Sequence, residues 1–339
     1  MKVDELRVKL YKLKQDEVIR LAIEFYKLVP KAKKEMYNLD GLIDTPEVKT
    51  AKPAAIENRV SFEDMALEVN TFIGNAKNQH YLYPNKIIAK KDRATWRFKV
   101  KAWYKEVTNP KTVGLDMNKK AEICANLYNL LCEACYCEYF SADDVFNSVA
   151  VEQADFFRSA LQLIDQTEGR VSLLNRGLDM AINNPTSPNN LHSYMLREFV
   201  NILDAEPIKY DAIDKVEKMI EANQPRILVT NSKKPFQEDF STKCRREEKT
   251  NRLAEMGFRI YSSLFQYEEA IVFYNKYAVR SDEEYKLYML IGLLFENQQK
   301  AHIQSVLEAA AASGVKLRSS LIKLLATIQQ QNVLPKYMG

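Results

Sequence analysis

Glycine and proline are both scarce in this chain, with nine glycines and eleven prolines among 339 residues. Glycine is less than half as frequent as its usual value of about 7%. Tight β-hairpins and barrels depend on glycine for positive φ angles and close backbone approach. The glycines also stand singly, never closer than the eight positions between Gly169 and Gly177. This spacing excludes glycine-rich phosphate loops and favours helices joined by short turns.

Long apolar runs are missing as well. The longest uncharged apolar stretches, Leu287 to Phe295 and Ile123 to Cys132, fall far short of the roughly 18–20 residues that a membrane helix needs. The opening residues MKVDELRVKLYKLK carry charges throughout, unlike a signal peptide. Five cysteines, an odd number, suit a reducing compartment better than a disulfide framework. We therefore expect a cytoplasmic protein without membrane attachment.

Metal ligands are also few. On a predicted helix, Cys124, Cys132 and Cys135 share one face, but Cys137 points away from it. No histidine lies within forty residues of these four cysteines. A zinc site needs four converging ligands, whereas cysteine readily packs as a small buried residue. The three histidines lie far apart, at positions 80, 192 and 302. The sequence therefore predicts no metal, no cofactor and no catalytic residue.

Helical periodicity is what the sequence does contain. Apolar residues recur at three- and four-residue steps in residues 1–39, where Asp16 is the expected cap of the second helix and Pro30 its end. Ser61 pairs with Asp64 in a predicted capping box, and Gly74 is the expected C-cap of that helix. The predicted fold class is all-α, with stacked helical hairpins in a right-handed α-solenoid, in one or two sub-domains.

Three segments follow from composition. Residues 1–205 form a predicted helical domain that opens with the hairpin 1–39 and the linker 41–60. Ser141 with Asp144 repeats the capping pattern, and residues 183–190, NNPTSPNN, give the strongest loop signal. Residues 206–240 hold a helix and a connector, whose run 227–229 is extended or a single strand. Residues 241–339 form the predicted C-terminal helical domain.

The C-terminal region carries a partial repeat. The segment from Tyr267 to Lys276, with Ala270 and Phe273, resembles the second helix of a tetratricopeptide repeat. Ser281 follows as an expected cap, and Tyr288-Met-Leu-Ile-Gly is similar to the start of the next unit. The resemblance covers residues 250–316 and implies units of about 34 residues that bind a protein or peptide on a concave face.

Residues 1–205 resemble an uncharacterised bacterial family of helical proteins. The residues that carry this resemblance are the hairpin from Leu6 to Pro30, the Tyr83-Pro84 step, and the run from Gln153 to Phe157. That family has no assigned activity, so the resemblance implies a helical fold and no chemistry.

The most distinctive local feature is basic and aromatic. Residues 86–105 contain eight lysines and arginines and one acidic residue, Asp92. Read as a helix, Trp96, Val100, Trp103 and Val107 fall on one face, while the arginines fall on another. An amphipathic helix in the core explains this pattern, and so does a polyanion-binding surface. The candidate polyanion-binding residues are Lys90, Lys91, Arg93, Trp96, Arg97, Lys99, Lys101 and Lys105.

Three hypotheses for function follow, and the sequence alone does not decide among them. The first is a non-enzymatic interaction protein or scaffold that binds another protein or peptide through residues 241–331. The second is a nucleic-acid-binding protein that uses residues 86–105. The third is a helical-repeat enzyme such as a nucleic-acid glycosylase, which needs an acidic residue beside aromatic rings in a basic pocket. The oligomeric state is not fixed by any of them.

Overall fold

The computed structural model describes residues 9–10, 12–36, 61–83, 85–110, 117–225, 239–280 and 282–338. Every regular element among these residues is helical, and none is a strand, so the predicted all-α class is confirmed. The predicted linker 41–60 and the run 227–229 lie outside the described residues. Contacts divide the chain into two units, Met1–Val60 and Ser61–Gly339.

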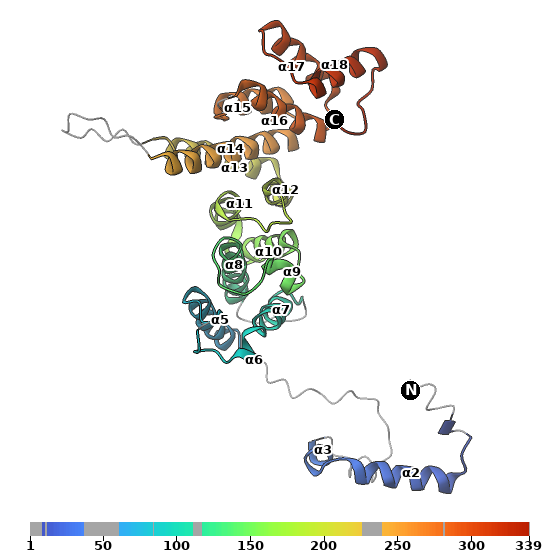
Figure 1. Ribbon diagram of the computed structural model, residues 1–339. Helices are drawn as coiled ribbons and strands as arrows, with labels where there is room; N and C mark the ends of the chain where they lie inside the picture. The colour runs from blue at the N-terminus through green and yellow to red at the C-terminus, as the bar shows by residue number, and fades with distance from the viewer. Residues whose placement is uncertain are drawn as a thin grey trace, which may run out of the picture. The chain divides into compact units, whose positions relative to one another are not determined.

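The first unit holds two short helices, α2 (Gln15–Leu28) and α3 (Lys31–Met36) (Figure 1). Pro30 separates them, as predicted, because proline lacks a backbone donor and clashes with the preceding turn. The expected cap Asp16 is wrong, since it lies in the first turn of α2. The Lys14 amide instead donates to the carboxylate of Glu17 at 2.8 Å, which satisfies one free end of the helix.

The second unit begins with helices packed around two long central ones (Figure 1). These central helices are α8 (Met117–Ala134) and α10 (Gln153–Ser172), which pack against each other. Around them lie α5 (Phe62–Lys77), α6 (Lys90–Arg93), α7 (Trp96–Val107), α9 (Val145–Val149), a π-helical turn η1 (Leu173–Gly177), α11 (Leu178–Asn183) and α12 (His192–Ile202). One apolar core connects them, and α8 contributes ten buried residues to its own packing.

Two of the predicted helix caps are corrected. Ser61 caps α5 as predicted, because its hydroxyl accepts from the Asp64 amide at 3.1 Å. Gly74 is not the C-cap: α5 continues to Lys77, and Gln79 takes the left-handed conformation at φ 59°. Asp144, rather than Ser141, caps α9 by accepting from the Asn147 amide at 3.0 Å. Helix α5 thus runs one turn beyond the glycine, whereas α9 begins at an ordinary aspartate cap three residues after Ser141.

Helix α13 (Glu206–Ala222) packs against α14 (Phe240–Ser263). In the sequence, residues 226–238 separate the two helices. Side chains of α14 enter the first core, among them Leu253 and Met256. The predicted helix of the segment 206–240 is α13, and most of its predicted connector lies outside the described residues.

The remaining helices form successive neighbours: α15 (Tyr267–Tyr277), α16 (Glu283–Glu296), α17 (Lys300–Ala312) and α18 (Ser319–Gln331). Helix α14 packs on α15, α16 on α17, and α17 on α18. The cap of α16 is Asp282, and the expected cap Ser281 lies outside the described residues. Arg259 is buried between the carboxylates of Glu255, at 2.8 Å, and Glu296, at 3.0 Å, and so joins α14 to α16.

Non-glycine residues in the left-handed conformation recur in this region at a nearly constant interval, and Gly314, at φ 82°, lies between the last two of them. Phe265, Gln298 and Asn332 have φ of 61°, 57° and 55°, and they are 33 and 34 residues apart. The first two turns also share a hydrogen bond that closes a helix end. The Gln266 amide donates to the Tyr261 carbonyl at 3.1 Å, and the Gln299 amide to the Leu294 carbonyl at 3.0 Å.

Two helical glycines provide a matched test of this packing. At Gly257 in α14, an added Cβ would overlap the ring of Phe273 in α15, whereas at Gly292 in α16 it would meet nothing within 4 Å. We expect Gly257→Ala to lower the free energy of unfolding by about 1–3 kcal/mol through overpacking. Gly292→Ala should raise it by about 0.4–1 kcal/mol by restricting the unfolded chain. Urea titrations of both variants check this, and equal effects of the two would contradict the packing.

Candidate binding sites along helix α7

Helix α7 buries the face that the sequence predicts. Trp96, Val100, Trp103 and Val107 all lie in the first core. The Trp96 ring stacks on Phe140, with centroids 4.1 Å apart. The two tryptophans therefore serve packing, since Trp96 is only 4% and Trp103 only 8% exposed. Their burial turns the lysines and arginines of the same helix toward its other sides.

The eight predicted polyanion-binding residues are not brought together at one place. Four of them, Lys90, Arg93, Trp96 and Arg97, line a cavity of about 390 Å³, which we call the basic cavity. Two more, Lys101 and Lys105, line a second cavity of about 640 Å³, which we call the dipolar cavity. Lys99 lines a third and smaller cavity, and the exposed Lys91 lines none of these three.

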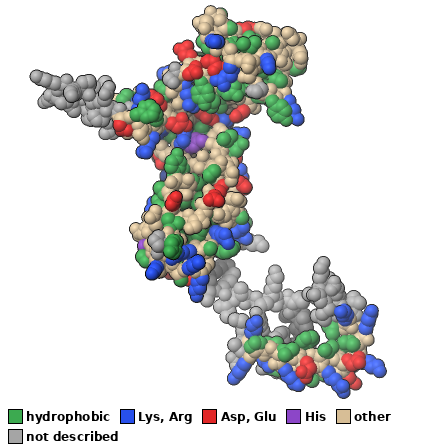
Figure 2. Space-filling model, viewed as in Figure 1, with side chains coloured by type: hydrophobic (Ala, Val, Ile, Leu, Met, Phe, Trp, Pro, Cys, Tyr) green, Lys and Arg blue, Asp and Glu red, His purple; other side chains and the backbone are tan. Residues whose placement is uncertain are grey.

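Among the described residues, none that lines the basic cavity is a carboxylate. Its remaining walls are tyrosine, serine and alanine side chains: Tyr81, Tyr83, Ala94, Ser141, Ala142 and Ser148. Within the described part of the chain, no Asp or Glu lies at ion-pair distance from its three cations. Figure 2 shows lysine and arginine side chains gathered at the end of unit 2 that α5, α6 and α7 form.

Backbone contacts hold one of these cations in place. The Arg93 guanidinium donates to the Ile88 carbonyl at 3.0 Å and to the Asn85 carbonyl. Arg97 is free of such bonds and lies over the Phe98 ring, 4.9 Å from its centroid. Phe98 is 62% exposed, and Tyr83 at the cavity is 84% exposed. The basic cavity thus combines a cation held by the backbone with the accessible ring of Tyr83, and Phe98 lies next to its cation Arg97 without lining the cavity.

The net positive charge of residues 86–105 is larger than the net charge of the whole chain. Eight of 49 basic residues and one of 45 acidic residues lie in 86–105. The rest of the chain then has 41 basic and 44 acidic residues and is slightly negative. A net charge of +4 therefore understates how strongly positive charge is concentrated around α6 and α7.

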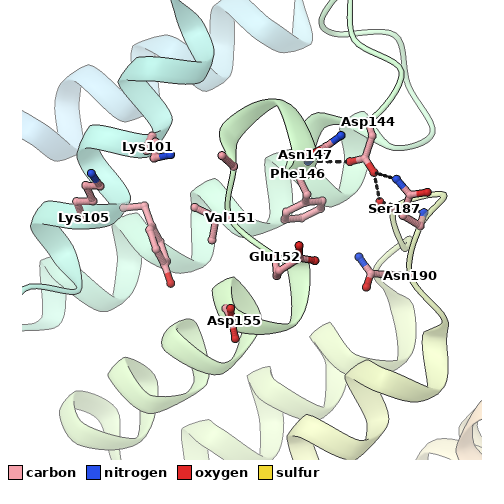
Figure 3. Close-up of a pocket in the computed structure, with 13 residues that line it drawn as sticks. Lys101, Lys105, Asp144, Phe146, Asn147, Val151, Glu152, Asp155, Ser187 and Asn190 are labelled. Carbon is pink, nitrogen blue, oxygen red and sulfur yellow. Dashed lines mark hydrogen bonds between the residues drawn. The ribbon is translucent and has the colours of Figure 1, made fainter.

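The dipolar cavity lies between α7, α9, the start of α10 and the loop 184–191 (Figure 3). Lys101 and Lys105 project from α7 on one side. Glu152, Asp155 and Asn190 face them from the start of α10 and from the loop. The cavity therefore has a cationic wall and an anionic wall, which the basic cavity does not.

A buried glutamine fixes the loop that closes the dipolar cavity. The Gln153 side chain is fully buried; its amide donates to the Pro185 carbonyl at 3.0 Å and its carbonyl accepts from the Ser187 amide at 2.8 Å. Asp144 accepts from the Ser187 hydroxyl at 2.6 Å and from the Asn189 side chain at 2.8 Å. The loop is thus held by two side chains from α9 and α10.

These bonds also decide the charge state of Asp144. Burial works to raise the pKa of this carboxyl, but hydrogen bonds from Ser187, the Asn147 amide and Asn189 outweigh burial and hold the pKa below its ordinary value. Asp144 is therefore ionised at neutral pH, and its carboxylate already accepts hydrogen bonds from the protein.

Sequence reasoning missed most of the dipolar cavity. The candidate residues included Lys101 and Lys105, but not Glu152, Ser187 or Asn190, which lie opposite them. The one signal that pointed there was the polar loop 183–190, whose partner in space the sequence does not give.

Cysteines and other metal-ligating residues form no centre in the described part of the chain, where no three of them are arranged to hold a metal ion. Cys124 and Cys132 are buried in the first core, while Cys137 and Cys244 are exposed. Burial raises the pKa of the Cys124 thiol to about 12, so it is protonated at neutral pH.

The three histidines lie in different surroundings. His80 faces Asn75 at 3.0 Å, and His302 faces Glu268 at 3.0 Å. His192, at the start of α12, is largely buried near Arg252. Burial, together with the positive charge of Arg252, lowers the pKa of His192 to about 3, against a smaller opposing effect of the Ala181 backbone. His192 is thus neutral across the physiological range.

No protein-family model matches this chain, and neither a curated protein nor a solved structure matches it. The resemblances of residues 1–205 and 250–316 stay predictions. Across the described residues, no helix is both long enough and apolar enough to cross a membrane.

The lowered pKa of His192 predicts a loss of stability in mild acid. Below pH 6.5 the unfolded chain protonates His192 while the folded chain does not, so protons favour unfolding. We expect the free energy of unfolding to fall by up to about 1.4 kcal/mol per pH unit between pH 6.5 and pH 5. Urea titrations at several pH values measure this slope. A His192→Gln variant, which cannot protonate, should lose that part of the slope; an unchanged slope would refute the assignment.

Proposed function

We propose that this protein is a non-enzymatic nucleic-acid-binding protein whose basic cavity holds the phosphate backbone of a single strand. The observation that carries the proposal is the convergence of Lys90, Arg93 and Arg97 on one cavity whose described lining residues include no carboxylate. Lysine and arginine neutralise phosphates and release the condensed counterions, which is the main source of affinity for a charged strand. An uncompensated cluster of this kind is more favourable for a polyanion than for a neutral ligand.

The surroundings of the cavity support a single strand as the polyanion. Tyr83 and Phe98 expose most of their rings beside the cations. Unstacked bases of a single strand can lie on such rings, and each stacked base contributes about 1–3 kcal/mol. The tryptophans take no part, because Trp96 and Trp103 are buried.

The proposal predicts a salt-dependent affinity that two substitutions weaken. Lys90→Ala combined with Arg97→Ala should weaken binding of a labelled single-stranded oligonucleotide and flatten the salt dependence. Each lost phosphate contact reduces the slope of log K against log salt by about 0.7. Fluorescence anisotropy between 50 and 200 mM salt gives this slope. Arg93 is left intact because it also holds the backbone at Asn85 and Ile88.

A matched control removes the same charge elsewhere. Arg197 and Lys218 are exposed on α12 and α13, so Arg197→Ala with Lys218→Ala changes the net charge equally. The control should bind with nearly the affinity and slope of the unmodified chain. If both double variants lose the same affinity, binding depends only on net charge and the assigned cavity is wrong.

A second candidate function is binding of a partner protein by helices α14 to α18. The recurrence of non-glycine left-handed residues at 265, 298 and 332 supports a repeating helical array, because tetratricopeptide units repeat about every 34 residues. Ala270 and Phe273, which the resemblance places between helices, are both buried. Arrays of this type bind proteins or peptides on one face, although the fold alone does not identify the partner.

Affinity capture tests this second candidate. The exposed side chains Val272 on α15 and Ile322 on α18 are available on its surface. We expect the full chain to recover a partner from native lysate, and Val272→Asp with Ile322→Asp to lose it while retaining the helical circular dichroism spectrum. Recovery of no protein above background would count against the candidate.

The enzyme hypothesis receives less support. A general acid that acts near neutral pH needs a raised carboxyl pKa. Asp144, the carboxylate most tightly held at the dipolar cavity, has its pKa lowered instead. We therefore propose no catalytic step.

A further inference from the structure

Three charged side chains at the dipolar cavity have no partner within the described part of the chain. The cavity is lined by five charged residues. Asp155 pairs with Arg158 at 2.8 Å, and Asp144 is occupied by the loop 184–191. No ion pair or side-chain hydrogen bond engages the remaining three, which are Lys101, Lys105 and Glu152. These three charges are available to a ligand.

Their placement defines the charges that a ligand should carry. The two lysines stand on α7, and Glu152 faces them from the start of α10 (Figure 3). A complementary ligand has two negative groups at one end and one positive group at the other. A short peptide with a free N-terminus and an acidic last residue has this distribution, since its α-carboxylate and side-chain carboxylate are adjacent.

We propose that the dipolar cavity binds the acidic C-terminal end of a short peptide, with its carboxylates at Lys101 and Lys105 and its ammonium group at Glu152. The cavity of about 640 Å³ lies within the range of about 300–1,000 Å³ typical of small-ligand sites. Three extended residues span at most about 10–11 Å, and a tripeptide is the probe chosen for a cavity of this volume.

Neutral groups of the cavity suit the peptide backbone. The side chains of Asn147 and Asn190 line it, and each amide offers both donors and an acceptor, as a peptide group does. Phe146 and Val151 supply an apolar surface beneath. Gln153 and Asp144 already hold the loop in place, so binding need not order it.

This proposal is independent of nucleic-acid binding, because the two use different side chains. The basic cavity uses Lys90, Arg93 and Arg97, and a phosphate strand gains nothing from Glu152. Failure of one proposal leaves the other unaffected.

Isothermal titration of the full chain with Ala-Ala-Asp tests the proposal. N-acetyl-Ala-Ala-Asp lacks the ammonium group, and Ala-Ala-Asn lacks the side-chain carboxylate. Each change should weaken binding about tenfold, as expected for a charge-assisted hydrogen bond. Glu152→Gln should weaken the binding of Ala-Ala-Asp by the same factor but leave the affinity for N-acetyl-Ala-Ala-Asp unchanged. Lys101→Gln with Lys105→Gln should abolish the preference for Asp over Asn.

The matched control is Glu221→Gln, which removes an exposed carboxylate from α13 and should leave peptide binding unchanged. The proposal is overturned if Ala-Ala-Asp shows no binding at about 5 mM, where even a weak site of about 1 mM would be occupied. The proposal is also overturned if the acetylated and free peptides bind with equal affinity. It is overturned as well if Glu152→Gln weakens the binding of both peptides equally. Affinity for the oligonucleotide should not change in Glu152→Gln.

Discussion

Burial of one face of α7 determines where every cation of that helix can lie. Trp96 and Trp103 remove a large apolar area from water and pack against aromatic rings of the core. Once that face is fixed, residues four positions apart on the opposite side are about 6 Å apart along the axis. Arg97 and Lys101 are such neighbours, yet they line different cavities. Packing of the hydrophobic face therefore divides one basic stretch of sequence into two electrostatic environments.

The amphipathic nature of α7 could be read from the sequence because it depends only on the period of a helix. The same is true of the break at Pro30 and the cap at Ser61, which are local effects. The prediction that Gly74 ends α5 was wrong, because glycine allows a left-handed turn but does not impose one. The helix continues to Lys77, and Ala76 is buried in the core beyond it.

The dipolar cavity could not be predicted, since its walls come from residues 101 to 190 and meet only through tertiary packing. Asp144 illustrates the difficulty. The sequence suggested a carboxylate in a capping box, whereas in the fold it caps α9 and also binds the loop 184–191. The role of Gln153 was equally hidden, because a buried glutamine is unusual and its partners are about thirty residues away.

The buried amide of Gln153 has a kinetic consequence for the cavity beside it. Opening the loop would break two hydrogen bonds at once and leave a polar group in the core without water, which is costly. The loop therefore stays in its closed arrangement whether or not the cavity is filled. Binding of the proposed ligand then requires no opening of this loop, and differences among ligands are expected mainly in their dissociation rates.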